Sequence, residues 1–207
     1  MLILDNVSCV YNNKSIFAGI NLQINCGASL LVVGGNGTGK TSLLKIMSSI
    51  IAPCTGQVLW NNRPLSAEIA GAHVYVNFIG HELALKQDLT VRQNLEFWAN
   101  LSGNPKLIAY TLDLLELKQY AKTPVFELSK GWQKKVALAR LIICDGDVWV
   151  LDEPFSNLDH NASQILAQII LDKTKSGGIT IASNHGEVLI DFDEKIDISA
   201  FCKPEAV

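Results

Sequence analysis

Eight consecutive residues have the types and spacing that hold phosphate groups: Gly34, Gly35, Asn36, Gly37, Thr38, Gly39, Lys40 and Thr41. They follow an apolar run and precede a helical pattern. Glycines let successive backbone N–H groups point at one anion, and a helix N-terminus adds its partial positive charge. Lys40 would supply a full charge to the outer phosphates, and the Thr41 hydroxyl can ligate Mg²⁺. The alternative is a glycine-rich turn that only links a strand to a helix. The strand-and-helix context favours a nucleotide site.

Two adjacent carboxylates follow an apolar stretch in the second half of the chain. Residues 148–151 are expected to form a buried strand, and Asp152 and Glu153 come directly after it. A carboxylate at the carboxyl end of such a strand lies beside the phosphate loop in open α/β sheets. We therefore expect Asp152 to hold Mg²⁺, directly or through water, and Glu153 to act as the general base on the attacking water. The alternative is a strand that ends in an acidic turn.

Five further residues are only weak indications of a functional site when each is considered by itself. Ser129 and Gly131 precede a helical pattern, where they form either a second anion-binding nest or a simple helix cap. Asp159 is typical of a helix N-cap, and His185 follows a predicted strand at the sheet edge where ligands bind. Tyr11 precedes a polar turn and is either a cross-strand core residue or a ring stacked on a purine.

The composition excludes some classes of protein. The 207 residues include 17 basic and 20 acidic side chains, a net charge of −3 and a pI near 5.8. This balance predicts no nucleic-acid partner, because proteins that bind nucleic acids usually have a basic patch. Hydrophobic residues make up 48% and the mean hydropathy is +0.22, yet no apolar run reaches the roughly 20 residues that span a bilayer. The apolar excess suggests a buried sheet and a surface that docks on a partner.

The cysteines and the first residues indicate a reducing compartment. The five cysteines are scattered and form no C-x-x-C pair, so we expect neither a zinc knuckle nor covalent haem attachment. The first residues lack a basic segment and a long apolar core, so a secretory signal is not expected. We expect the protein to work in the cytoplasm.

Strands and helices are expected to alternate along most of the chain. A helical subdomain is expected at about 82–135, between core segments 1–81 and 136–207. Strands alternating with helices predict a mostly parallel sheet covered on both faces. Strands are expected at 2–4, 7–11, 20–24, 30–33, 74–79, 148–151 and 179–183, and helices at 41–51, 91–101, 105–120, 134–144 and 160–174.

Taken in order, the motifs resemble those of the ATP-binding subunits of ABC transporters over essentially the whole chain. They are G-G-N-G-T-G-K-T at 34–41, L-S-K-G-W at 128–132, V-L-D-E-P at 150–154, S-N-L-D at 156–159 and a His after the last β-strand. The resemblance implies an α/β fold, a P-loop ABC-type ATPase with a parallel-sheet core, an antiparallel N-terminal β-region and a helical insert. It also implies Mg²⁺-dependent ATP hydrolysis coupled to integral membrane permease subunits.

The resemblance further implies a homodimer that sandwiches two ATP molecules head to tail. Tyr11 would stack on adenine, Glu153 would activate water, His185 would contact the γ-phosphate, and Asp159 would lie in a turn at the dimer contact. A γ-phosphate held from both chains exists only before hydrolysis, so ATP would close the dimer and hydrolysis would open it. The phosphate loop of one subunit would face the signature residues of the other: Ser129, Lys130 and Gly131.

Four positions depart from the family pattern. Gly35 replaces the usual Pro and loosens the loop, while Lys130 replaces Gly and Trp132 replaces Gln in the signature. Lys130 could add charge to the γ-phosphate across the dimer. His81 occupies the place of the magnesium-sensing Gln. Its ligand role is open, because a neutral imidazole can bond water or metal whereas its protonated form cannot.

A narrower resemblance rests on three segments: G-H at 80–81, L-K-x-x-L-T at 85–90 and N-L-x-F-W at 94–98. With the compact size, they resemble the haem-exporter ATPases of cytochrome c maturation. That family implies a peripheral subunit at the cytoplasmic face of the inner (cell) membrane, with cytochrome c maturation membrane proteins as partners. We expect docking near 81–98, where five residues are unusually apolar for a segment beside a loop: Leu83, Leu85, Leu89, Phe97 and Trp98.

Other functions fit parts of the sequence. An ABC ATPase for another cargo, such as a lipid or a small solute, would carry the same motifs, and its membrane partner would distinguish it. A soluble ABC ATPase of translation or DNA repair usually has two cassettes or a long coiled-coil insert, unlike this chain. A nucleotide kinase would explain the phosphate loop but neither Ser129 nor His185. The sequence specifies neither the cargo nor whether hydrolysis drives haem export or haem release to an acceptor.

Overall fold

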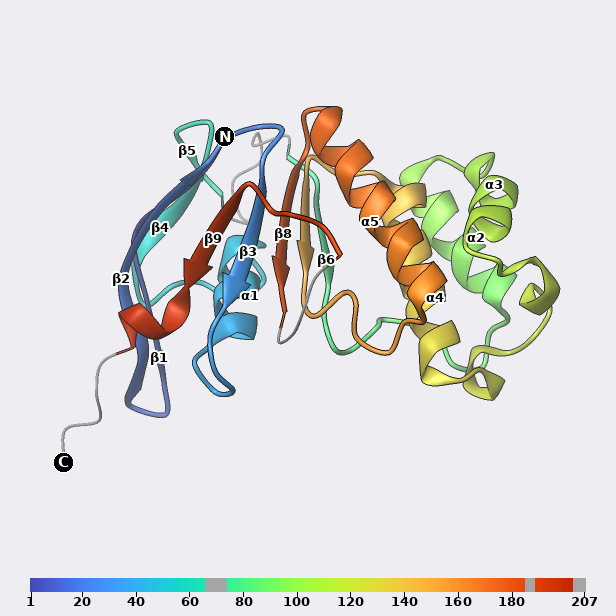
Figure 1. Cartoon of the computed structure of the whole chain (residues 1–207), viewed down its shortest axis with the longest axis horizontal. Helices are drawn as coiled ribbons and strands as arrows, with labels where there is room; N and C mark the ends of the chain where they lie inside the picture. The colour runs from blue at the N-terminus through green and yellow to red at the C-terminus, as the bar shows by residue number, and fades with distance from the viewer. Residues whose placement is uncertain (66–73, 185–188, 203–207) are drawn as a thin grey trace.

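Two β-sheets with a helix between them form the body of the protein (Figure 1). The computed structural model describes residues 1–65, 74–184 and 189–202. It combines an antiparallel N-terminal sheet, a parallel five-stranded sheet and an inserted helical block. The predicted α/β fold class is therefore confirmed.

The antiparallel sheet forms one flank of the molecule, with strand order β2-β1-β4-β5. Both of its tight turns are Asn-Asn pairs, at 12–13 and 61–62, with φ between 49° and 63°. Asn tolerates this left-handed conformation, which two-residue hairpins require. The two strands expected at 2–4 and 7–11 were wrong, because a register shift rather than a break separates them. The strands are β1 (Leu2–Tyr11), β2 (Lys14–Ile24), β4 (Thr55–Trp60) and β5 (Arg63–Pro64).

The parallel sheet places the ends of several strands at one edge. Its order is β6-β7-β8-β3-β9, and every pair is parallel. The phosphate loop follows β3, Asp152 follows β7 and His81 lies just beyond β6, so all three meet at the carboxyl edge. The strands are β3 (Ser29–Val33), β6 (Val76–Ile79), β7 (Val148–Leu151), β8 (Ile179–Ser183) and β9 (Glu194–Asp197).

Helices cover both faces of the parallel sheet. Helix α1 lies between the two sheets, and α4 and α5 lie on the opposite face (Figure 1). The helical block consists of α2, α3, η1 and η2 and occupies the end of the molecule away from the antiparallel sheet. The helices are α1 (Lys40–Met47), α2 (Val91–Ser102), α3 (Leu107–Leu114), η1 (Lys118–Tyr120), η2 (Val125–Glu127), α4 (Lys130–Cys144), α5 (His160–Lys175) and η3 (Ile198–Phe201).

Helix α4 is shared between the helical block and the parallel sheet. Val136, Ala139 and Ile143 pack into the core of the helical block. Leu138 and Leu141 pack into the separate core beneath the sheet. These spacings give one helix two apolar faces. The domain boundary expected between 135 and 136 falls inside this uninterrupted helix.

Three helices differ from their predicted bounds by more than one residue. The helix expected over 41–51 ends at Met47, and Ser49 beyond it has a left-handed φ of 56°. The helix expected over 105–120 was wrong, since α3 is followed by Glu116, whose left-handed φ of 58° turns the chain. The helix expected over 134–144 starts earlier, at Lys130. The Ser129 hydroxyl accepts a backbone N–H of the first turn and caps the helix there.

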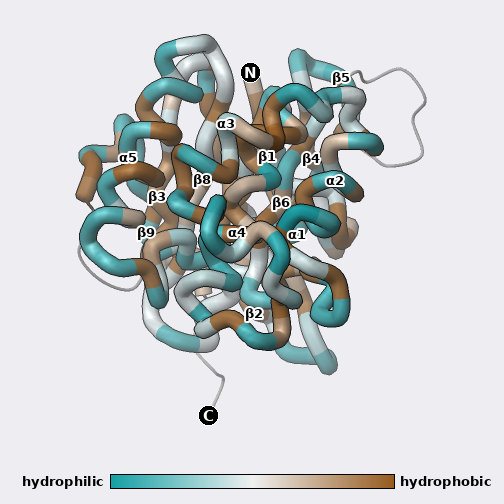
Figure 2. The backbone as a smooth tube through the Cα atoms, turned by 90° about the vertical axis from the view of Figure 1, so that its right-hand side faces the viewer, coloured by the Kyte–Doolittle hydropathy of each residue, from teal (hydrophilic) through white to brown (hydrophobic). Residues whose placement is uncertain are grey.

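Hydrophobic residues are concentrated in the central strands. In β7 and β8 every side chain is buried, as expected for a parallel sheet covered on both faces. Figure 2 views the molecule from the end that α2 and α3 form, and shows hydrophilic stretches in many of the outer turns. Among the helices that the structure describes, none combines the length and the apolar character needed to cross a bilayer.

Ser29 fastens the start of β3 to the segment before β9. Its backbone N–H and its hydroxyl donate to Asp193 Oδ2 at 2.8 and 2.7 Å. The hydroxyl and then the N–H lower the pKa of the Asp193 carboxyl. A carboxylate whose pKa is lower in the folded protein than in the unfolded chain stabilises the folded protein at pH values above the unfolded pKa. That stabilisation is lost as the pH falls through the folded value.

Ser29→Ala is therefore expected to lower the Tm by about 2–4 °C at neutral pH. The deficit should narrow as the pH falls below about 4 and through the lowered folded-state pKa of Asp193, because protonation removes the charge that the Ser29 hydroxyl stabilises. Thermal unfolding, monitored by circular dichroism at neutral pH and at a pH below about 4, measures the difference in Tm. Ser176→Ala, which removes a hydroxyl bonded to the Lys173 carbonyl, is the matched control. An equal loss of Tm at both pH values would show that the charge of Asp193 contributes nothing to the stability that Ser29 provides.

Candidate active site

The phosphate loop (34–41) joins β3 to α1 and surrounds a positive charge. Gly39 is the N-cap of α1 with φ 95°, and a Cβ there would lie 2.3 Å from Ile16 Cγ2, so the position requires glycine. The Lys40 side chain is 6% exposed. Its ammonium donates to the carbonyls of Gly34 and Gly35, both at 2.9 Å. The loop therefore combines a full charge with the N–H groups of a helix start, which suits a phosphate.

Asp152 is the buried centre of a hydrogen-bond network. Its Oδ2 accepts from Thr41 Oγ1 at 2.7 Å, and its Oδ1 accepts from the Ser183 hydroxyl at 2.6 Å. The Ser183 hydroxyl in turn accepts from the Glu153 N–H at 3.0 Å. His81 Nε2 lies 3.5 Å from Asp152 Oδ2. The ends of β6, β7 and β8 thus converge with the start of α1 on one carboxylate.

The oxygen donors at this point suit Mg²⁺. Thr41 Oγ1 and Asp152 Oδ2 lie 2.7 Å apart. Neighbouring ligands around an octahedral ion with bonds of about 2.1 Å are separated by about 3 Å. Mg²⁺ prefers hard oxygen ligands and keeps several waters. The two residues predicted to hold the metal therefore fit this ion.

An open hollow of about 500 Å³ lies over the phosphate loop. Tyr11 lines it and is 69% exposed, which excludes the alternative of a core residue. Glu153 and His81 line it as well. A hollow with phosphate-binding groups below and an aromatic ring beside them has the composition of a nucleotide site. Stacking of Tyr11 on a purine stays a prediction.

The signature segment (128–132) lies against the Asp159 turn (156–159). Ser129, Gly131 and Asp159 line a cavity of about 230 Å³ that is separate from the hollow. A Cβ at Gly131 would lie 2.7 Å from the carbonyl oxygen of Asn157, so the contact between the two segments requires glycine. Lys130 is exposed in the first turn of α4.

Lys135 connects the Asp159 turn to the helical block. Its Nζ lies 3.2 Å from the Glu116 carboxylate and 3.4 Å from that of Asp159, and 4.3 Å from the ring of Trp132. As N-cap of α5, Asp159 also accepts from the Ala162 N–H at 2.7 Å. That hydrogen bond first, and the Lys135 charge after it, lower the pKa of Asp159. The turn is held from both neighbouring elements.

Two residues of the site were not predicted from the sequence, and one predicted residue is not described. Ser183 ends β8 beside β7, and a hydroxyl at the end of a neighbouring strand could have signalled it. Lys134 is 5% exposed, and a lysine on the buried face of a helix was the available signal. His185 lies outside the described residues, so its role stays a prediction.

Comparisons with known proteins identify the family. The ABC transporter family model matches residues 17–156. The chain belongs to the family of ABC transporter ATP-binding proteins. This ABC transporter ATP-binding protein is thus an ATP-hydrolysing transporter subunit that binds ATP. It is 36% identical, over 97% of its length and 98% of the relative's, to a protein of Wolbachia pipientis wMel named cytochrome c biogenesis ATP-binding export protein CcmA. A Haemophilus influenzae protein of the same name is 32% identical over 97% and 96%.

Solved structures share the fold. An ABC transporter ATP-binding protein from Pyrococcus furiosus superposes with a TM-score of 0.83 and 27% identity, covering 98% of this chain and 99% of that one. The ATP-binding cassette MJ0796, a dimer in a post-hydrolysis state bound to ADP and phosphate, gives a TM-score of 0.76 at 22% identity over 90% and 88% of the two chains. The second likeness bears on the fold alone.

Proposed function

We propose that this ABC transporter ATP-binding protein energises haem export, or haem release to an acceptor, during c-type cytochrome biogenesis. The observation that carries the proposal is the 36% identity to the Wolbachia protein over nearly the whole of both chains. That relative's name assigns it to cytochrome c biogenesis and export. The segments at 80–81, 85–90 and 94–98 support the same assignment from the sequence.

The site supports a defined division of roles. The phosphate loop and Lys40 bind the phosphates, and Tyr11 stacks on adenine. Thr41 and Asp152 hold Mg²⁺, which when bound neutralises charge on the phosphates. Glu153 takes the proton of the attacking water, and His185 contacts the γ-phosphate. His81 faces the same region from β6, and its imidazole is available to a water or the metal.

Two copies of the chain complete each other's sites in this proposal. The signature segment lines a cavity apart from the hollow, so it is available to ATP on a second chain. Head-to-tail pairing brings Ser129, Lys130 and Gly131 over the partner's phosphate loop, with Asp159 at the contact. The MJ0796 cassette, which shares the fold, is itself a dimer. The helical insert, about 82–135, then carries the signature to the core of the other chain.

The membrane partner docks near 81–98, and the protein is peripheral at the cytoplasmic face of the inner membrane. Of the five apolar residues of that segment, Leu85 and Trp98 pack against the core of the helical block. Phe97 is 47% exposed. Leu101, one turn further along α2, is 71% exposed and extends the same face. Phe97 is therefore the strongest docking candidate.

Phe97→Glu is expected to lower the membrane-bound fraction of the protein about tenfold or more, since a charge opposes burial at a docking face. ATP hydrolysis by the purified variant should be unchanged. Sedimentation of native membranes, followed by immunoblotting, measures the fraction. Ile50→Glu, at a similarly exposed apolar residue beyond α1, is the control. Unchanged membrane recruitment of Phe97→Glu would exclude this docking face.

Purification from native membranes in a gentle detergent tests the cellular role. Mass spectrometry identifies the partners, and an absorption scan detects haem. Membrane subunits of cytochrome c maturation in the eluate would support the proposal. A different permease would replace haem by another cargo and leave the ATPase roles intact. Absence of any membrane partner would overturn the proposed coupling to transport.

A further inference from the structure

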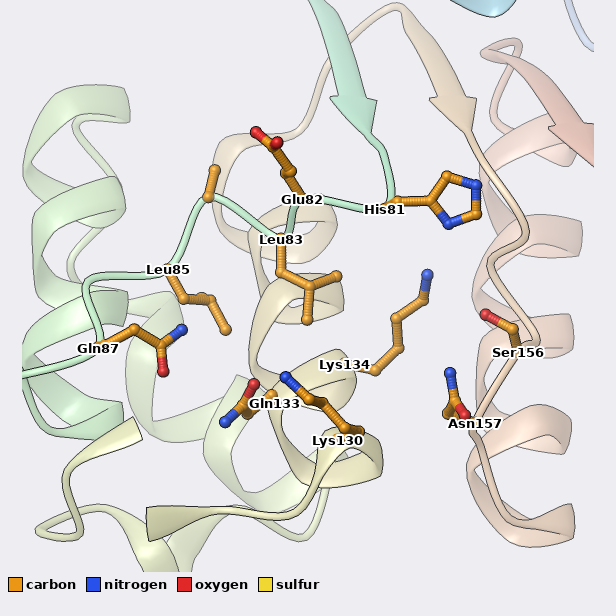
Figure 3. A pocket seen from close by; sticks show the side chains of 11 residues that line it. His81, Glu82, Leu83, Leu85, Gln87, Lys130, Gln133, Lys134, Ser156 and Asn157 are labelled. Atoms are coloured by element: carbon orange, nitrogen blue, oxygen red, sulfur yellow. The ribbon is translucent and has the colours of Figure 1, made fainter. Parts of the chain in front are cut away.

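Lys134 is a buried lysine between the signature segment and the proposed general base. It is 5% exposed on α4. Figure 3 shows its side chain pointing from the helix toward the space between His81 and Ser156, in a cavity of about 450 Å³. Burial lowers the pKa of Lys134, while the charges of Asp152 and Glu153 oppose that shift. A buried ammonium costs stability, so its presence calls for a functional explanation.

The Lys134 ammonium contacts the backbone of Glu153. It donates to the Glu153 carbonyl at 3.2 Å. The same carbonyl accepts from the Ser156 hydroxyl at 2.8 Å and from the Ser156 N–H at 3.2 Å. On the other side, the Glu153 N–H donates to the Ser183 hydroxyl at 3.0 Å. Glu153 has a φ of 47°, a conformation that persists in a non-glycine residue only where its surroundings hold it. These hydrogen bonds therefore hold the Glu153 backbone from α4, from β8 and from the turn that follows.

The same helix carries the signature segment. Ser129 caps α4, and Lys134 lies about 7.5 Å further along the helix axis. Both apolar faces of α4 are packed, one in the helical block and one under the parallel sheet. A displacement of Ser129 would therefore be transmitted along a packed helix to the Lys134 ammonium.

We propose that Lys134 is a positioning residue that holds the left-handed turn at Glu153 and links it to the signature segment of the same chain. The inference rests on the proposed role of Glu153 as general base. Without the ammonium, the turn loses a donor that comes from α4, and the carboxylate shifts away from the attacking water. A misplacement of about 1 Å can cost about 10²-fold in rate.

Lys134→Met keeps an unbranched side chain only one atom shorter and removes both its charge and its donor. We expect kcat to fall about 10- to 100-fold, with the KM for ATP within about threefold of wild type. Lys134→Arg, which keeps a charged donor and has the adjoining cavity for its larger head, should restore most of the rate. The Tm of the Met variant should equal or exceed that of wild type, because an apolar chain replaces a buried ammonium. A lowered Tm or failure to fold would make Lys134 a structural residue and overturn the inference.

A double-mutant cycle tests whether Lys134 acts through Glu153. In the Glu153→Gln background, Lys134→Met should not lower the residual rate further, because the base it positions is already absent. Effects that multiply would contradict the inference. Lys173→Met, at a largely buried lysine paired with Asp145 on another element, should leave kcat unchanged and is the control. Wild-type turnover in Glu153→Gln would refute the proposed base. If Lys134→Met turns over ATP normally while Glu153→Gln is inactive, the positioning role of Lys134 is refuted and the proposed base is not.

Discussion

Replacing Glu153 by glutamine should slow ATP turnover by about 10²- to 10⁴-fold while ATP still binds. The amide has nearly the shape of the carboxylate but cannot take a proton from water. The Glu153 N–H donates to the Ser183 hydroxyl and the Glu153 carbonyl accepts from the Ser156 hydroxyl, and neither bond involves the Glu153 side chain, so the turn should persist. Steady-state phosphate release measures the rate, and titration with a fluorescent ATP analogue measures binding.

The same variant should accumulate as an ATP-bound dimer, because nothing then removes the γ-phosphate that holds two chains together. Size-exclusion chromatography with light scattering, in ATP and in ADP, distinguishes the two states. Glu127→Gln, at an exposed acid of η2, should behave as wild type. If the variant loses turnover but stays monomeric in ATP, Glu153 remains the proposed base and the ATP-bound dimer is contradicted. Wild-type turnover would exclude Glu153 as the base.

Lys40→Met should weaken ATP binding by about 10²-fold or more, which corresponds to about 2.7 kcal/mol. The Lys40 ammonium is the full positive charge inside the phosphate loop, and it is 6% exposed. Methionine fills a similar volume but gives the phosphates no charge. The carbonyls of Gly34 and Gly35 also lose the donor that they share. Isothermal titration calorimetry with ATP and Mg²⁺ measures the affinity.

Lys45→Met is the matched control for this loss, since Lys45 lies in the last turn of the same helix. It should bind ATP as wild type does. Unchanged affinity in Lys40→Met would mean that backbone N–H groups alone hold the phosphates. Equal losses in both variants would indicate damage to α1 rather than removal of a phosphate contact.

Short-range patterns in the sequence predicted the elements that position the site. The strands expected at 148–151 and 179–183 match β7 and β8 at both ends, because short apolar runs between polar residues mark buried parallel strands. A strand, a glycine-rich loop and a helix in that order bring Thr41 to the same sheet edge as Asp152. The predicted neighbourhood of these two residues follows from topology alone.

Contacts between distant segments could not be obtained in this way. The hydrogen bond of Lys134 depends on how α4 crosses the end of β7, and periodicity says nothing of that crossing. The early end of α3 depends on one residue, Glu116, which has a left-handed conformation. Glutamate does not favour that conformation, so the sequence gives no sign of it. The role of Ser183 required knowing that β8 is the neighbour of β7.

The presence of Ser129 and Lys134 on one helix has a consequence for a pair of ATP sites. In the proposed head-to-tail dimer, Ser129 would contact ATP bound to the partner, whereas Lys134 would orient the Glu153 that acts on the chain's own ATP. Occupation of one site would then alter the rate of hydrolysis at the other. Turnover should therefore rise with ATP concentration more steeply than a simple hyperbola. A non-hydrolysable analogue bound at one site should change the rate at the other.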